Sequence, residues 1–65
     1  MKIFLNGTEV VTNAKNLSEL LLEQDIPANK IAAEVDLVVV PKSNYENFPI
    51  LENAKIEIIT FVGGG

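Results

Sequence analysis

Few side chains in this sequence belong to the types that carry out catalysis or bind a metal. The chain has no cysteine and no histidine, so the commonest nucleophile–base pairs and the usual zinc ligands are missing. Neither Ser18 nor Ser43 has a plausible base, and the neighbouring acids Glu23 and Asp25 are more typical of a solvent-facing surface than of a catalytic pair. We therefore predict no catalytic residue, no metal site and no cofactor bound by this chain, which is not expected to be an enzyme by itself.

One reactive group remains, the C-terminal carboxylate of Gly65, which ends a run of three glycines directly after an apolar segment. A free carboxylate is a poor electrophile, but a partner enzyme that used ATP to adenylate it would open its carbonyl to a sulfur donor. Gly63 and Gly64 would suit such a tail, because glycine leaves the backbone unrestricted and uncrowded. Fully extended, three residues reach about 10 Å into a narrow active site. The alternatives are a frayed end or a remnant of expression.

The charge balance argues against nucleic acid as a partner. The net charge is −4, and the five basic residues are all lysines spread singly along the chain, which gives no phosphate-binding stripe. The acidity fits solubility or a basic or mixed partner surface. No apolar run approaches the roughly 20 residues of a membrane span, and the N-terminal segment is too short for a signal peptide. We expect a cytoplasmic protein that contacts neither membrane nor nucleic acid.

The hydrophobic pattern predicts a hairpin, a helix and further strands. Asn6-Gly7 between two apolar runs is typical of a type I′ hairpin turn. Asn16 is expected to cap a helix whose apolar face is formed by leucines, and Pro27 ends it. Strand patterns follow at 31–35 and 37–40, with Asp36 in a turn between them, then an irregular connection at 42–49 and a last strand that begins at 55.

The resulting element order is β-β-α-β-β-β, an α+β fold in which one helix covers a mixed sheet. An opening hairpin, a crossover helix and a final apolar strand make the β-grasp (ubiquitin-like) arrangement the expected architecture, with the first and last strands parallel at the centre. We assign 1–62 to this domain and 63–65 to a flexible tail. Four apolar residues near the tail are predicted to form a docking surface for partners, unless the 45–51 segment covers them; these residues are Phe4, Ile59, Phe61 and Val62.

Over its whole length the sequence resembles the ThiS family, the sulfur carriers of bacterial thiamine biosynthesis. The resemblance rests on the opening MKIFLNG, on VVPKSNY after a middle strand and on the ending IEIITFVGGG. It implies that a ThiF-type enzyme adenylates Gly65 with ATP and Mg²⁺, that a cysteine desulfurase relay supplies sulfur for a thiocarboxylate, and that thiazole synthase (ThiG) receives it. The sequence departs from the family in Lys42, where members often carry arginine, and in ENAK before the last strand, where Asn53 can still adopt a left-handed conformation.

Two other functions fit the same fold. A carrier of the MoaD type, the small subunit of molybdopterin synthase, also ends in two glycines, although those chains tend to be longer. A ubiquitin-like interaction module with an inert tail is the alternative from a different class, and fold alone does not decide between them. In each case we expect the free chain to be a monomer.

Overall fold

The computed structural model describes residues 1–61. The predicted docking residue Val62 and the glycines Gly63–Gly65 lie outside the described residues. The elements are five strands, one α-helix and two short 3-10 helices, namely β1 (Lys2–Leu5), β2 (Thr8–Val11), α1 (Leu17–Glu23), η1 (Ala28–Lys30), β3 (Ile31–Val35), β4 (Val38–Val40), η2 (Lys42–Asn47) and β5 (Lys55–Thr60).

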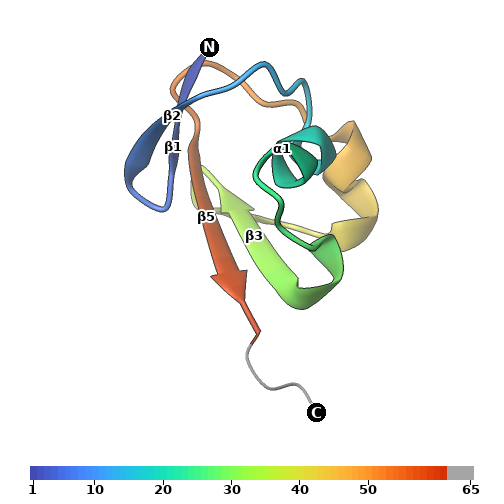
Figure 1. The fold of residues 1–65 in the computed structure, drawn as a ribbon. Coiled ribbons are helices and arrows are strands. Elements are labelled where there is room, and N and C mark those ends of the chain that lie inside the picture. Colours follow the sequence, from blue (N-terminus) through green and yellow to red (C-terminus); the bar gives the residue numbers. More distant parts are fainter. Residues whose placement is uncertain (62–65) are drawn as a thin grey trace.

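The strands form one mixed sheet in the order β2-β1-β5-β3-β4. β1 and β5 are parallel neighbours, as the sequence predicts, whereas β5 and β3 run antiparallel. Helix α1 and η2 lie on one side of this sheet (Figure 1). Because the helix covers only one face, the strands alternate between side chains that enter the core and side chains on the other, outer face.

The opening hairpin follows from its turn residues. Asn6 and Gly7 both have positive φ, 50° and 81°, which is the conformation that a type I′ turn requires and that Asn-Gly adopts at low cost. The two-residue turn sets the register, with Leu5 opposite Thr8. Ile3 is consequently fully buried, whereas Phe4 on the other face is half-buried.

Helix α1 begins at the predicted cap. The Asn16 side chain accepts a hydrogen bond from the Glu19 N–H at 2.8 Å, and the Glu19 carboxylate accepts one from the Lys15 N–H at 2.8 Å. This is a capping box in which the reciprocal bond reaches one residue further back than usual. The predicted apolar face is buried against the sheet, and it consists of Leu17, Leu20 and Leu21.

The β3–β4 turn contains two residues rather than one. Asp36 and Leu37 both have positive φ, 50° and 71°, so Leu37 belongs to the turn and not, as predicted, to the strand. Leucine gives no sequence signal for this conformation, which is unfavourable for a side chain with a Cβ. Asp36 holds the turn in place: its N–H donates to the Lys55 carbonyl at 2.8 Å, and its side chain accepts from the Lys55 N–H at 3.0 Å.

The connection predicted to be irregular contains the 3-10 helix η2. Tyr45 within it is buried in the core, and η2 packs beside α1. A buried aromatic residue explains why the segment is ordered, because its burial removes a large apolar area from water. Asn53 has φ of 67°, the left-handed conformation predicted for it, and its N–H donates to the Lys2 carbonyl at 2.7 Å.

Candidate docking face and carrier strand

Strand β5 carries the chain from the middle of the sheet to the glycine-containing segment. It is hydrogen-bonded to β1 on one side and to β3 on the other. The pairing with β3 continues to the end of the strand, where Ile31 lies opposite Thr60 and the Phe61 N–H donates to the Lys30 carbonyl at 2.9 Å. The N-terminus and the end of β5 lie at opposite ends of the molecule (Figure 1). The root of the predicted tail is thus the end of the central strand of the sheet, which β3 holds up to this point.

The Asn6 side chain extends the contact between β1 and β5. The β1–β5 register ends with Leu5 opposite Ile56, after which the hairpin turn leaves the sheet. Asn6 still donates its N–H to the Ile56 carbonyl at 2.8 Å, and its side-chain oxygen accepts from the Ile58 N–H at 2.7 Å. A turn residue therefore satisfies a backbone donor of β5 that no strand reaches.

Alternation along β5 separates core residues from outer-face residues. Ile56 and Ile58 are buried, whereas Glu57 and Ile59 are exposed on the outer face. This is the division that the sequence predicts. Ile59 is 56% exposed and Phe61 beyond the strand is 59% exposed, so both large apolar side chains are accessible at the end of β5 that leads to the tail.

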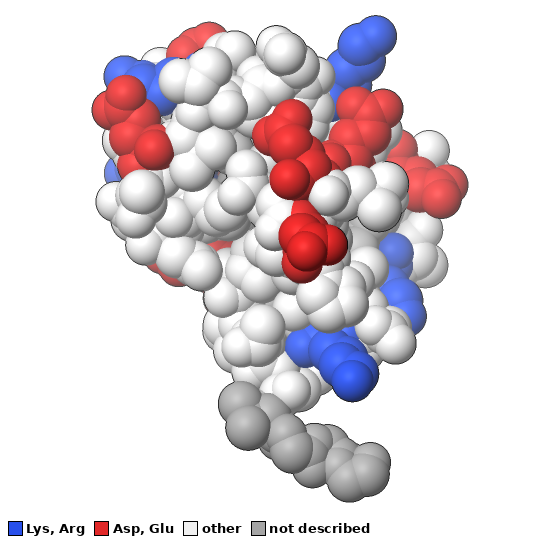
Figure 2. Space-filling view, in the orientation of Figure 1, with Lys and Arg blue, Asp and Glu red and all other residues white. Residues whose placement is uncertain are grey.

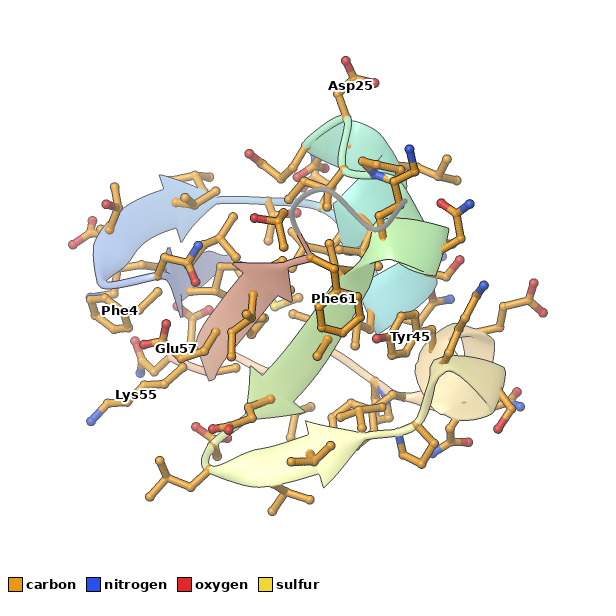
Figure 3. All side chains as sticks on the ribbon, turned by 90° about the horizontal axis from the view of Figure 1, so that it is seen from below. Phe4, Asp25, Tyr45, Lys55, Glu57 and Phe61 are labelled. Atoms are coloured by element: carbon orange, nitrogen blue, oxygen red, sulfur yellow. The ribbon has the colours of Figure 1, made fainter. Side chains whose placement is uncertain are left out.

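The predicted docking residues do not form one continuous cluster in residues 1–61. Phe4 lies opposite Lys55, at the beginning of β5, while Phe61 lies beyond its end. Glu57 projects from the outer face between them, and Phe4, Glu57 and Phe61 are seen at separate places along the sheet in Figure 3. Ile59 instead has Ala32 of β3 as its cross-strand neighbour. The apolar residues next to the tail are therefore Ile59, Phe61 and Ala32, with Phe4 apart from them.

The middle of the outer face is acidic. Glu34 of β3 and Glu57 of β5 are direct cross-strand partners, an arrangement in which like charges destabilise the pair. The lysines of this region lie at its far end, where the Lys2 Nζ is 5.6 Å from the centroid of the Phe4 ring and Lys55 is opposite Phe4. The pairing of Glu34 with Glu57 is not predictable from the local sequence pattern, because it depends on the β3–β5 register.

The distribution of charged side chains on the surface agrees with the net negative charge and the scattered lysines of the sequence. On the face shown in Figure 2, acidic side chains gather in the upper half, whereas the basic side chains stand singly and form no stripe. No helix among residues 1–61 is long and apolar enough to cross a membrane.

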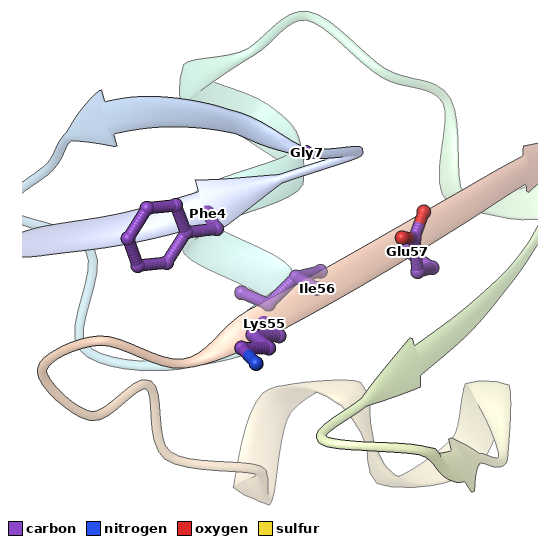
Figure 4. A pocket seen from close by; sticks show the side chains of 5 residues that line it. All are labelled: Phe4, Gly7, Lys55, Ile56 and Glu57. Atoms are coloured by element: carbon purple, nitrogen blue, oxygen red, sulfur yellow. The ribbon is translucent and has the colours of Figure 1, made fainter.

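A hollow of about 200 Å³ opens between the hairpin turn and the beginning of β5. Its walls come from both β1 and β5, with an aromatic ring at one side and a carboxylate at the other (Figure 4). Gly7 leaves open space beside it, since a Cβ there would meet nothing within 4 Å. The hollow offers room for one side chain of a docked protein; its lining residues are Phe4, Gly7, Lys55, Ile56 and Glu57.

The side chains considered for catalysis are dispersed. Ser18 is in the first turn of α1 and Ser43 is in η2. The Glu23 carboxylate accepts a hydrogen bond from the Thr12 hydroxyl, so it anchors the helix end, while Asp25 is exposed with φ of 59°. Within residues 1–61, no three His, Cys, Asp or Glu side chains gather as metal ligands would. The candidate functional region is therefore β5 and the segment that follows it.

Comparison with known proteins places the chain in a family. The sequence profile of the ThiS family matches residues 3–65. The chain belongs to the ThiS family. The predicted family and the predicted β-grasp fold are therefore both confirmed.

Two solved structures resemble this ThiS-family chain along its full length. A crystal structure of the thiamine biosynthesis protein ThiS from Geobacter metallireducens superposes with a TM-score of 0.86 at 22% identity, and the match covers 100% of both chains. A solution NMR structure of a thiamine biosynthesis protein from the same organism gives a TM-score of 0.79 at 25% identity, covering 100% of this chain and 88% of the other. At 22% identity the crystal structure supports the fold alone.

Two protein sequences are more similar. A thiazole synthase of Paramagnetospirillum magneticum is 39% identical over 66 residues, which is 100% of this chain but only 20% of the synthase. The uncharacterized protein ycf40 of Trieres chinensis is 41% identical over 63 residues, which covers 95% of this chain and 86% of that protein. The ThiS-family chain thus matches a fifth of the length of the synthase.

Proposed function

We propose that this chain is a sulfur carrier of thiamine biosynthesis and that the carboxylate of Gly65 is the group that carries the sulfur. The observation that supports this most directly is the family match, which extends to Gly65 and therefore includes the glycine run. The fixed position of β5 adds to it, because the strand presents its end at one extremity of the molecule.

In the proposed reaction, a ThiF-type enzyme binds ATP and Mg²⁺, and this chain binds neither. The Gly65 carboxylate attacks the α-phosphorus of ATP and displaces pyrophosphate, which gives an acyl-adenylate. A persulfide supplied through a cysteine desulfurase then attacks the acyl carbon with its outer sulfur and displaces AMP, and a thiol reductant cleaves the S–S bond of the resulting acyl disulfide. The product is a thiocarboxylate on Gly65. The glycine residues contribute an unhindered acyl carbon and a narrow tail.

The proposed acceptor is a thiazole synthase of the ThiG type. Support comes from the Paramagnetospirillum protein named thiazole synthase, a fifth of which matches this chain. The same comparison favours thiamine over a molybdopterin carrier. Rescue of a thiazole auxotroph, without rescue of a molybdenum-cofactor mutant, is the expected genetic result. We further propose that the reaction takes place in the cytoplasm, where ATP is available.

Docking in this proposal uses the outer face beside β5. Ile59 and Phe61 are exposed next to the predicted tail, and a partner that covers them gains the burial of two large apolar side chains. Val62 continues the chain toward the glycines and is included in the proposed contact. Phe4 lies at the other end of β5 and, with the hollow beside it, is proposed to meet a more distant part of the partner.

The test is an intact-protein mass spectrum after incubation with ATP, Mg²⁺, a ThiF-type enzyme, a cysteine desulfurase, cysteine and a thiol reductant. The chemistry requires Gly65 to be the terminal residue of the mature chain, so the spectrum of the untreated protein is recorded first. The expected result is a mass increase equal to the exchange of one oxygen for sulfur, absent in a chain that lacks Gly65. An unchanged mass, with an activating enzyme that is active on another carrier, would overturn the proposal and favour an interaction module.

A further inference from the structure

β4 is an edge strand of the sheet with an exposed apolar centre. Its side away from β3 has no strand partner among residues 1–61. Edges in natural proteins are commonly protected by short strands or by proline, and β4 consists of three valines followed directly by Pro41, which limits any pairing to a short segment. Val39 at its centre is 66% exposed. The other edge strand, β2, carries Glu9 within it.

The register determines which backbone groups of β4 point outward. Val35 pairs with Val38, and Ala33 pairs with Val40. The two-residue turn closes on the first of these pairs, which therefore exchanges backbone hydrogen bonds. Hydrogen-bonded and non-hydrogen-bonded pairs alternate in an antiparallel ladder, so Val38 and Val40 direct their N–H and C=O groups toward β3. Val39 directs its own N–H and C=O away from the sheet.

This edge is complementary to itself. When two β4 strands lie antiparallel with Val39 on a two-fold axis, the two Val39 residues can exchange both backbone hydrogen bonds. Beyond the three valines, the same arrangement brings the turn that contains Asp36 of each copy to the end of β4 in the other copy, where Lys42 begins η2, so exposed charges of opposite sign lie at the same place. We propose that the β4 edge is an interface at which a second copy of this chain adds to the sheet.

Apolar groups beside the edge support the same arrangement. A groove of about 260 Å³ lies between the beginning of β4 and the 48–51 segment, with Leu51 exposed at its rim and Leu37 90% exposed in the turn. The antiparallel pairing brings Pro41 and Lys42 of the second copy to this end, where they cover part of the exposed apolar surface. Groove residues are Val35, Asp36, Val38, Phe48, Pro49, Leu51 and Ala54.

The proposed interface is small, so the association between two copies is expected to be weak. One short strand and an apolar rim give less contact than a stable dimer uses, so the expected dissociation constant is roughly 0.1–1 mM. The dilute chain is then the monomer that the sequence predicts. The two-fold axis is perpendicular to the sheet, so the outer faces of both copies stay uncovered on one side. Self-association therefore does not compete with the proposed docking at Ile59 and Phe61.

Sedimentation and ¹⁵N–¹H NMR spectra, recorded from roughly 20 μM to 2 mM chain, test the proposal across the expected dissociation constant. The expected result is an apparent mass that rises with concentration, with chemical shifts moving at 37–42. Val39→Lys places two like charges at the axis and is expected to abolish both effects. The substitution is compatible with folding because Val39 is exposed and lies opposite Glu34. Val11→Lys is the matched control, because Val11 is 78% exposed and lies on β2, the other edge strand. This variant should change neither the concentration dependence of the mass nor the chemical shifts at 37–42.

Charge variants test the register. Lys42→Asp should weaken association several-fold, and Asp36→Asn should weaken it less while keeping an oxygen for the Lys55 N–H. The proposal is overturned when the parent chain stays monomeric at the highest concentration, or when a folded Val39→Lys variant still associates. It is also overturned when Val11→Lys abolishes association, or when the shifts move at Ile59 in place of β4.

Discussion

The side-chain oxygen of Asn6 accepts a hydrogen bond from the backbone N–H of Ile58 at 2.7 Å, although 52 positions separate the two residues. Asn6 is also the first residue of the hairpin turn, with φ of 50°. The same side chain thus serves the local turn and fastens the turn to the strand that leads to the predicted tail. Ile58 is buried, so its N–H has no ready replacement partner in water.

We expect substitutions of Asn6 to separate these two roles. Asn6→Asp keeps the acceptor and the tolerance of positive φ, and should cost least. Asn6→Gly keeps the turn but leaves the Ile58 N–H unsatisfied, at a cost of about 1–3 kcal/mol. Asn6→Ala loses both and should be the least stable. Urea denaturation followed by circular dichroism gives the order, and equal stability of the Gly and Asp variants would contradict the importance of the hydrogen bond.

The local elements of this fold are predictable from short sequence signals. Asn6-Gly7 determines the first hairpin because few other residue pairs accept two positive φ angles. Asn16 determines the beginning of α1, because its side chain satisfies an N–H group that the helix leaves unpaired. The burial of Leu20 follows from the 3.6-residue period of the helix. Each signal acts over a few residues.

Features that depend on distant pairing were not accessible in the same way. The Glu34–Glu57 contact results from the β3–β5 register, and the separation of Phe4 from Ile59 results from the position of Phe4 at the beginning of β5. The apolar side chain of Leu37 predicts a strand, whereas the contacts of Asp36 with Lys55 hold Leu37 in the turn. The parallel pairing of β1 and β5 follows from the expected β-grasp arrangement and not from periodicity.

The strained turn predicts a stabilising substitution. Leu37 is 90% exposed with φ of 71°, so its side chain contributes little burial while its backbone is in a left-handed conformation. That conformation costs about 1–2 kcal/mol for a residue with a Cβ, and glycine avoids it at the expense of roughly 0.5–1 kcal/mol of extra entropy in the unfolded chain.

We therefore expect Leu37→Gly to raise the free energy of unfolding by about 0.5–1 kcal/mol, measured by urea denaturation. Leu22→Gly is the matched control, because Leu22 is also largely exposed, at 79%, but lies within α1. That substitution should lower stability by about 1 kcal/mol. A loss of stability in both variants would show that the turn is not strained.

The packing of α1 against the core contributes to stability, and Leu20 tests it. Leu20 is fully buried, so Leu20→Ala should cost about 2–5 kcal/mol through lost burial and the cavity that remains. A domain of this size is only marginally stable, so much of the variant should be unfolded at 25 °C. Leu22→Ala, on the exposed side of the same helix, should change stability by less than about 0.5 kcal/mol. Thermal melts of the two variants make the comparison, and equal losses would contradict the assigned helix face.

Glu34 and Glu57 lie opposite each other and carry the same charge, so removal of one of the two charges should stabilise the folded protein. Glu57→Gln keeps the shape of an exposed side chain and removes the repulsion, so we expect a gain of roughly 0.2–1 kcal/mol at neutral pH. Salt screens exposed charges, hence the gain should shrink between 0.01 and 1 M NaCl, a range over which the screening length falls from about 30 to 3 Å. Glu9→Gln on β2 controls for the change in net charge. A gain that is the same at both salt concentrations would exclude repulsion as its cause.

The outer face gives the last prediction, which depends on the proposed carrier function. Ile59→Ser and Phe61→Ser should each lower the rate of pyrophosphate release by a ThiF-type enzyme about tenfold or more at subsaturating carrier, because large apolar anchors contribute more than 1 kcal/mol each to an interface. Phe4→Ala should have a smaller effect, since Phe4 lies at the opposite end of β5. Leu22→Ser removes an equally apolar exposed side chain on the helix side and should leave the rate unchanged. Wild-type rates for Ile59→Ser and Phe61→Ser, in variants whose circular dichroism spectra match the parent, would assign docking to another face while leaving the chemistry at Gly65 untouched.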